Sequence, residues 1–194
     1  MKKILNIAAG KFKPLGFPPK DPYILVNLDT MYYQIDEPGY IEKKFSTWTG
    51  QSPKTFHCNI DAFQFMERTR LSFDTVCIYR FLEHVSFTNL MYFIYLISTV
   101  TEKGSIVDVI VPNYEILSTM ILNEDCKRPE FEADNILLTT ELLNEPSCPH
   151  ASIWTPDRAY HFWEMEERFK IKDLIRNFTF DGRDIYLRFS AERI

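Results

Sequence analysis

Small and acidic residues follow the first two predicted strands, and together they could bind the ribose of a nucleoside. The first apolar run ends in Ala8-Ala9-Gly10, which Lys11 follows, and the second run is followed by Asp29. Small residues let a ligand come close to the backbone, and a carboxylate at that place can accept hydrogen bonds from both ribose hydroxyls. We therefore expect these five residues to bind a nucleoside-containing ligand.

Two further strand ends carry polar groups. Asp61-Ala62 follows the third apolar run, and the fourth run ends at Tyr79, with Arg80 next. The Asp61 carboxylate, or the backbone amide beside it, can meet the exocyclic amine of an adenine. The guanidinium of Arg80 can bind a carboxylate or a phosphate. These four residues complete the predicted binding set.

Two histidines are candidate general bases. His84 lies in a turn just after the fourth run, although a histidine beside an apolar run commonly packs instead of reacting. His150 lies in an irregular, proline-rich segment that would cover the cleft, where loops often carry substrate contacts. Trp154 and Tyr114 are further candidates on the side of a second substrate, with packing as the alternative for Trp154.

The elements that must position these residues are predicted from short apolar runs and helical periodicity. Strands are expected at residues 4–9, 23–28, 55–60, 75–79, 105–112, 169–180 and 185–190, and helices at 88–102, 116–123 and 154–169. Lys103-Gly104 would end the first helix, Thr155 would cap the third, and Asp181-Gly182 would turn the last hairpin.

Apolar strands joined by crossovers indicate a parallel sheet buried on both faces. The fold class is therefore α/β, a Rossmann-like, seven-stranded, mostly parallel sheet with an antiparallel C-terminal hairpin strand. Residues 1–194 form one domain, a size that suits a single core. Ligands of such sheets bind beyond the carboxyl ends of the strands, where the candidate residues above fall.

The connection between the first two strands cannot hold a helix. Its glycines and prolines are Gly10, Pro14, Gly16, Pro18, Pro19 and Pro22. Proline inside a helix removes a hydrogen bond and clashes with the preceding turn. The usual crossover helix is therefore replaced by a loop.

The charge and cysteine content limit the kinds of partner that the protein is expected to bind. The net charge is −5, which disfavours a duplex nucleic-acid binder with a basic face. The 4 cysteines include no Cys-x-x-Cys pair, so neither a zinc site nor a disulfide framework is expected. The chain starts directly with a strand-like run, and its longest apolar stretch is too short for a bilayer. We expect a cytoplasmic protein without membrane contact.

The stretch "FDTVCIYRFLEHV", followed after a helix by "EKGSIVDVIVP", resembles the class I S-adenosylmethionine-dependent methyltransferases. The segments "LNIAAG", "VNLD" and "NIDAF" are similar to the three cofactor motifs of a small subgroup with a short loop between the first two strands. The resemblance spans residues 4–113. It implies S-adenosylmethionine as the cofactor of the binding set above, and methyl transfer to an acceptor that the sequence leaves open: a small molecule, a glycan or a protein side chain.

Two other hypotheses stay open. Ala9 and Phe12 stand where the family commonly has glycine, so the fold could persist without catalysis and serve assembly or partner binding. Alternatively, a nucleotide-binding enzyme of another class could use Asp29 on a ribose and the lysines between Lys11 and Lys20 on phosphates. The sequence does not specify an oligomeric state.

Overall fold

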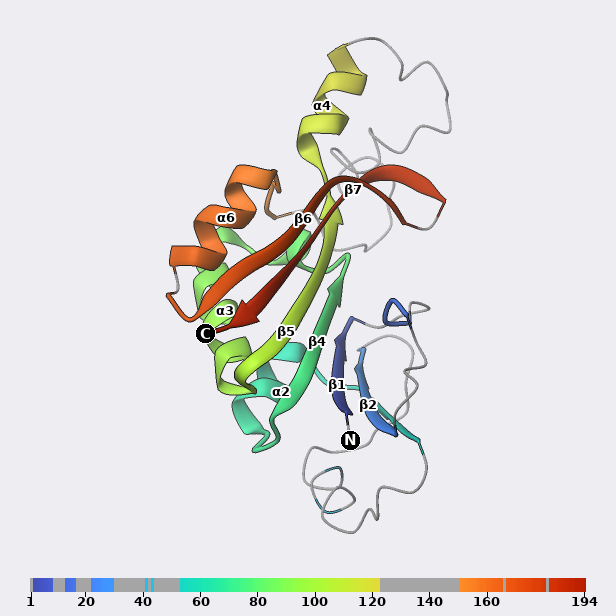
Figure 1. Ribbon diagram of the computed structural model, residues 1–194, viewed down its shortest axis with the longest axis vertical. Helices are drawn as coiled ribbons and strands as arrows, with labels where there is room; N and C mark the ends of the chain where they lie inside the picture. The colour runs from blue at the N-terminus through green and yellow to red at the C-terminus, as the bar shows by residue number, and fades with distance from the viewer. Residues whose placement is uncertain are drawn as a thin grey trace.

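The protein folds around one seven-stranded sheet, seen in the computed structural model in Figure 1. The structure describes residues 2–8, 13–16, 22–29, 41, 43, 53–122, 151–165, 167–180 and 182–194. The strands are β1 (Lys2–Ile7), β2 (Tyr23–Leu28), β3 (Lys54–Cys58), β4 (Phe73–Tyr79), β5 (Thr101–Pro112), β6 (Phe169–Phe180) and β7 (Arg183–Arg193). The described helices are α2 (Ala62–Arg68), α3 (Phe87–Thr99), α4 (Tyr114–Leu122) and α6 (Pro156–Met165), with a short 3₁₀ helix, η1, at Leu82–His84.

The strands follow the order β3-β2-β1-β4-β5-β7-β6. Strands β1 to β5 pair in parallel, whereas β7 runs antiparallel between β5 and β6. The predicted α/β fold with a mostly parallel sheet and an antiparallel C-terminal strand is thus confirmed. The order reverses between β1 and β4, and such a switch point opens a crevice beyond the carboxyl ends of the strands.

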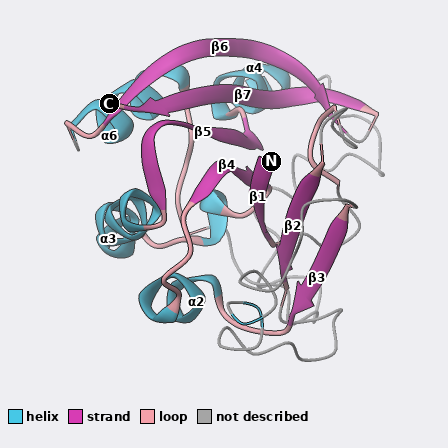
Figure 2. Cartoon of the chain, turned by 60° about the horizontal axis from the view of Figure 1, so that its bottom comes forward, coloured by secondary structure: helices cyan, strands magenta, loops and turns pink. Residues whose placement is uncertain are grey.

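The described helices α2, α3 and α6 all cover the same face of the sheet (Figure 2). Their apolar side chains form the larger core with one face of the strands, for example Leu5, Val76, Phe93 and Trp163. Packing of this kind removes several hundred square ångströms of apolar surface from water, which is the main stabilising term of a domain.

The opposite face carries a smaller core. It joins Ile4, Leu25, Tyr79 and Tyr186 of the strands to Tyr114 at the start of α4. The connection between β1 and β2 also reaches this face, because the Leu15 N–H donates to Tyr79 Oη at 3.1 Å. Residues 13–16 form a turn, as the absence of a crossover helix requires there.

Polar side chains occupy one row of this second face. Directly paired residues in register across the seven strands are His57, Asn27, Asn6, Cys77, Asp108, Ser190 and Asp173. Asn6 Nδ2 donates to Asn27 Oδ1 at 3.0 Å, and Asn27 Nδ2 lies 3.3 Å from His57 Nδ1. The alternation of side chains along a strand places all of these groups on the same side of the sheet. The sequence assigns no role to His57, and in the structure it lies beside the amide of Asn27.

The predicted end of the first helix was wrong. Helix α3 ends at Thr99, and Gly104 lies inside β5 with a φ of 87°. The β-branched residues around Val100 disfavour further helix, and Thr99 Oγ1 and Thr101 Oγ1 donate back to the carbonyls of Leu96 and Ile97 at 2.7 Å each. Gly104 instead serves a register shift in the pairing of β4 with β5, where a positive φ favours glycine.

The C-terminal helix and hairpin form as predicted, but α6 is shorter than the predicted 154–169 and β7 is longer than the predicted 185–190. The Thr155 hydroxyl accepts the N–H of Arg158 at 3.3 Å, so it caps α6 as expected. Gly182 has a φ of 77° in the turn between β6 and β7, while Asp181 lies outside the described residues. The helices in the described ranges lack the long apolar run that a membrane crossing requires.

Candidate functional site

The ends of β1 and β2 bring two predicted binding residues together. Ile7 and Leu28 are paired in register, so the residues that follow them, Ala8 and Asp29, lie at neighbouring strand ends. Ala8 has a φ of 52°, which turns the chain sharply away from the sheet. The Asp29 N–H donates to the carbonyl of Cys58 at 3.0 Å, which fixes the backbone of Asp29 at the rim between β2 and β3.

Several predicted site residues lie outside the described part of the chain. These are Ala9, Gly10 and Lys11 of the predicted binding set and the candidate base His150. Their assignments stay predictions.

Asp61 is a helix cap as well as a candidate ligand. Its Oδ1 accepts the N–H groups of Phe63 and Gln64 at 2.9 and 3.2 Å, at the start of α2. Ala62, the next residue of the predicted set, is buried in the first turn of this helix. Helix α2 is absent from the predicted elements; an aspartate before a helical pattern with buried Ala62, Phe65 and Met66 was the signal for it.

The capping role of Asp61 can be tested with two matched variants. We expect Asp61→Ala to lower the free energy of unfolding by about 1 kcal/mol, because two N–H groups lose their acceptor. Asp61→Asn should stay within a few tenths of a kcal/mol of the wild type, since asparagine caps helices equally well. Urea titration of both variants checks this, and equal losses in the two would refute the capping role.

The side chain of Tyr79 belongs to a buried network. Its Oη donates to Asp108 Oδ2 at 2.6 Å, and Asp108 also accepts from Arg188 Nε at 3.0 Å and Nη2 at 3.2 Å. Burial, followed by the nearby Cys77 and Asp108, raises the pKa of Tyr79 far above its usual range. With its hydroxyl engaged in this way, Tyr79 can offer a ligand in the crevice only its backbone.

Arg80 bends the chain at the end of β4. It has a φ of 55°, and its N–H donates to the carbonyl of Ile110 at 2.8 Å. A non-glycine residue with positive φ is uncommon and frequently marks a functional site. The bend directs the chain into η1, directly at the topological switch point.

Helix η1 carries His84 and a buried acid. His84 is half-buried, and its N–H donates to the carbonyl of Phe81 at 2.9 Å. The preceding Glu83 is only 1% exposed, and its Oε2 has no hydrogen-bond partner among the described residues. Burial raises the pKa of Glu83 to about 7, with Arg80 acting in the opposite direction. From the sequence alone, Glu83 is expected to pack beside His84. The one feature that could have indicated a functional role for Glu83 is that a carboxylate lies within an apolar run.

The segment that precedes α6 is fastened onto η1. The carbonyl of Glu83 accepts the N–H groups of Ala151 and Ser152 at 2.7 and 3.0 Å, and Ser152 Oγ donates to the carbonyl of Leu82 at 2.8 Å. Trp154 is 1% exposed and stacks on Phe189 with ring centroids 6.1 Å apart. Trp154 is therefore a core residue, and the chain before it is hydrogen-bonded to the backbone carbonyl of Glu83.

Two tyrosines complete the surroundings of this acid. Tyr114, at the start of α4, and Tyr186, paired with Pro112, are 5% and 0% exposed. The guanidinium of Arg183 lies beside Tyr186 Oη. Burial, and then the charge of Glu83, raises the pKa of Tyr114 to about 12. We call Arg80, Glu83, Tyr114 and Tyr186 the strand-end cluster.

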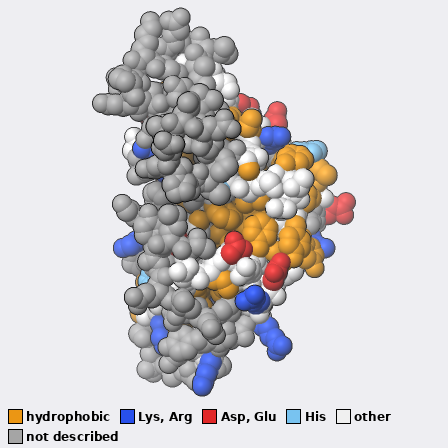
Figure 3. Space-filling view, turned by 180° about the vertical axis from the view of Figure 1, so that it is seen from behind, with side chains coloured by type: hydrophobic (Ala, Val, Ile, Leu, Met, Phe, Trp, Pro, Cys, Tyr) orange, Lys and Arg blue, Asp and Glu red, His pale blue; other side chains and the backbone are white. Residues whose placement is uncertain are grey.

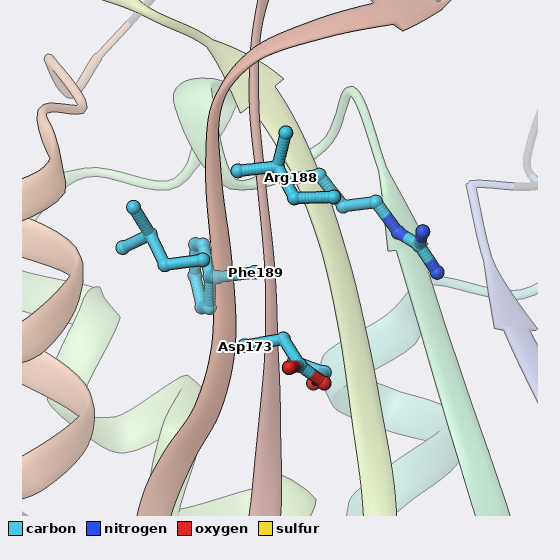
Figure 4. A pocket seen from close by; sticks show the side chains of 6 residues that line it. Asp173, Arg188 and Phe189 are labelled. Carbon is cyan, nitrogen blue, oxygen red and sulfur yellow. Dashed lines mark hydrogen bonds between the residues drawn. The ribbon is translucent and has the colours of Figure 1, made fainter.

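The other surface features of the described residues lie away from the crevice. A hollow of about 280 Å³ over β6 and β7 is lined by Asp173, Leu174, Ile175, Arg188, Phe189 and Ser190 (Figure 4). Its one cationic side chain, Arg188, already binds Asp108. Lys2 and Lys3 lie at the amino end of β1, at the edge opposite Asp29, so they cannot hold phosphates beside it.

Comparisons with known proteins support the fold. No family model and no curated protein matches the sequence. A solved S-adenosylmethionine-dependent methyltransferase from Methanosarcina mazei aligns over 100% of this chain and 92% of its own, with a TM-score of 0.61 and 16% identity. The 1,6-didemethyltoxoflavin-N1-methyltransferase of Burkholderia thailandensis, solved with S-adenosylhomocysteine, aligns over 99% of this chain and 71% of its own, with a TM-score of 0.60 and 11% identity.

A third solved structure agrees. The N-methyltransferase NodS from Bradyrhizobium japonicum WM9 aligns over 99% of this chain and 85% of its own, with a TM-score of 0.54 and 12% identity. At these identities the likeness concerns the fold alone. The chain has the class I methyltransferase fold, and the resemblance read from its sequence is confirmed at that level.

Proposed function

We propose that this chain is an S-adenosylmethionine-dependent methyltransferase that binds its cofactor beyond the carboxyl ends of β1, β2 and β3. The observation that supports this most strongly is the juxtaposition of Ala8 and Asp29 at neighbouring strand ends, next to the switch point between β1 and β4. Two of the similar methyltransferases were solved with S-adenosylhomocysteine, which makes this ligand the natural probe.

The described residues fit such a cofactor. Ala8 combines a small side chain with a left-handed backbone, so the end of β1 can be approached closely. In our proposal the Asp29 carboxylate accepts the ribose hydroxyls, Asp61-Ala62 faces the adenine, and Arg80 attracts the carboxylate of the methionine portion. Ala9, Gly10 and Lys11 would line the same rim, and Tyr79 would contribute its backbone.

Methyl transfer requires mainly that the protein positions the cofactor and the acceptor. The bound cofactor supplies an activated methyl group on a sulfonium centre. The residues of the crevice hold it in line with the acceptor atom, and such positioning can provide most of the acceleration. A base is needed only when the acceptor must lose a proton, and η1 carries described candidates for that role.

One experiment tests the binding site. We expect Asp29→Ala to weaken S-adenosylhomocysteine binding at least about tenfold, because hydrogen bonds to a charged group contribute about 1.5–3 kcal/mol. Asp74→Ala is the matched control, since Asp74 is exposed and binds the Lys3 N–H at the opposite edge of the sheet. Isothermal calorimetry on both variants tests this expectation. Equal affinities of the two variants for S-adenosylhomocysteine would show that Asp29 does not bind the ligand.

A second candidate function is a methyltransferase fold that binds a partner without catalysis. One observation favours it: hydrophobic side chains gather on the surface that Figure 3 shows. Phe87, Tyr92 and Tyr95 of α3 are 51%, 46% and 42% exposed, more than is common for large apolar groups on one helix. The calorimetric titration separates the two, because a partner-binding relic would bind no S-adenosylhomocysteine.

A further inference from the structure

We propose that the carboxyl group of Glu83 binds the methyl acceptor through an N–H or O–H group and takes up its proton during transfer. This inference rests on the proposed function and names the chemical class of its second substrate. It assigns the base to a residue other than the two histidines that the sequence suggests.

The carboxyl group of Glu83 is in an unusual state. Carboxylates are almost never fully buried without partners, because an unsatisfied buried polar group costs about 1–3 kcal/mol or more. Glu83 is 1% exposed, and its Oε2 lacks a partner in the described ranges. Tyr186 Oη, in the same cluster, is also buried, and the guanidinium of Arg183 lies beside it. The unpaired Oε2 of Glu83 is therefore the atom to which a polar group of a ligand would bind.

The position of Glu83 also suits contact with an acceptor. Glu83 follows β4 by four residues, and β4 is the strand that pairs with β1 across the switch point. The proposed cofactor lies on the β1 side of that point, beside Ala8 and Asp29. An acceptor held at the strand-end cluster would therefore lie across the crevice from it, beside η1, to whose backbone Ala151 and Ser152 are hydrogen-bonded.

The charged and titratable groups around Glu83 suit a proton transfer. Arg80 contributes a positive charge from the end of β4, and His84 follows on η1. Tyr114 contributes a hydroxyl from the start of α4, and Tyr186 contributes one from β7, with the positive charge of Arg183 beside it. Burial raises the pKa of Glu83 to about 7, close to where a general base works best. Tyr114 and Tyr186 stay protonated at this pH and can donate hydrogen bonds.

The transfer step conserves atoms and electrons. A nitrogen or oxygen of the acceptor forms a bond to the methyl carbon as the carbon–sulfur bond breaks, and the electron pair of the broken bond goes to the sulfur, which becomes a neutral thioether. Glu83 Oε2 accepts the proton that the acceptor loses and later releases it to water. An acceptor carboxylate needs no such base, and its charge would meet a buried carboxylate at close range.

Three probes of equal size test the acceptor class. Benzylamine, benzyl alcohol and benzoate share one ring and differ in their polar group. We expect benzylamine to bind the S-adenosylhomocysteine complex of the wild type at least about tenfold more tightly than benzoate does, a difference of about 1.4 kcal/mol. Glu83→Gln should weaken benzylamine binding about tenfold or more and leave the affinity for S-adenosylhomocysteine unchanged. Glu83→Asp should recover part of the loss.

Glu102→Gln is the control, because Glu102 is exposed at the amino end of β5, away from the crevice. The proposal is overturned if Glu83→Gln binds benzylamine as the wild type does, if benzoate binds as tightly as benzylamine, or if no probe binds the complex. A titration of S-adenosylhomocysteine without probe is run first. Failure at that stage would overturn the proposed function, and this inference with it.

Discussion

Replacing Asp108 with alanine is expected to lower the free energy of unfolding by about 3 kcal/mol. Asp108 is 8% exposed and accepts three hydrogen bonds, one from Tyr79 Oη and two from Arg188. Its removal leaves a buried hydroxyl and a partly buried guanidinium without their acceptor. The guanidinium also lies over the ring of Phe178, 5.2 Å from its centroid, and its side chain is 32% exposed, so water replaces part of what it loses.

The matched control is a surface pair on the same hairpin. Lys172 Nζ lies 2.7 Å from Glu192 Oε2, with side chains 51% and 32% exposed. Pairs of this kind contribute at most about 1 kcal/mol, so Glu192→Ala should lose little. Chemical denaturation of both variants at one pH gives the comparison. A loss for Asp108→Ala no larger than that for Glu192→Ala would show that the buried network does not stabilise the fold.

The second large effect concerns the pH dependence of stability. We expect the stability of Glu83→Gln to rise relative to the wild type by about 3 kcal/mol between pH 4.5 and 7. Burial raises the pKa of Glu83 from 4.5 to about 7, so the folded protein favours the neutral carboxyl. Wild-type stability from this group is therefore full below pH 4.5, falls as the pH rises through the interval and stays low above 7.

Glutamine keeps the shape of the side chain and does not titrate, so other titrating groups cancel in the difference. Urea titrations of both proteins at half-unit steps of pH give the two curves. Parallel curves would contradict the burial of an ionisable carboxyl at η1, whatever the affinity for ligands turns out to be.

Strands with strong local signals could be predicted from the sequence. Residues 23–28 and 169–180 agree with β2 and β6 at both ends, because each is an apolar or alternating run bounded by turn residues. The start of α6 was also predictable, since a threonine followed by proline is a strong local cap signal. These features depend on neighbours in the sequence.

Features that depend on distant contacts could not be predicted. Asp108 and Arg188 are 80 residues apart and meet only because β7 inserts beside β5. The register shift at Gly104 appears only once β4 and β5 are paired. Ser152 bonds to the carbonyl of Leu82, 70 residues away in the sequence, and no local pattern reveals this contact.

Some features of the candidate site could likewise be predicted from the sequence, and others could not. Strand ends are local features, so the apolar runs alone were enough to place Ala8, Asp29 and Arg80 at one edge of the sheet. The direction of a side chain is decided by packing on each face, so the engagement of Tyr79 with Asp108 could not be predicted. The same holds for the capping role of Asp61.

The proposed function depends on the crevice at the switch point binding S-adenosylmethionine. The sharpest test is calorimetric titration of the wild-type chain with S-adenosylhomocysteine, the product form of the cofactor. We predict saturable binding at one site with a Kd below about 1 mM, a binding free energy more favourable than about −4 kcal/mol. No heat of binding and no protection against thermal unfolding at millimolar ligand would refute the proposal.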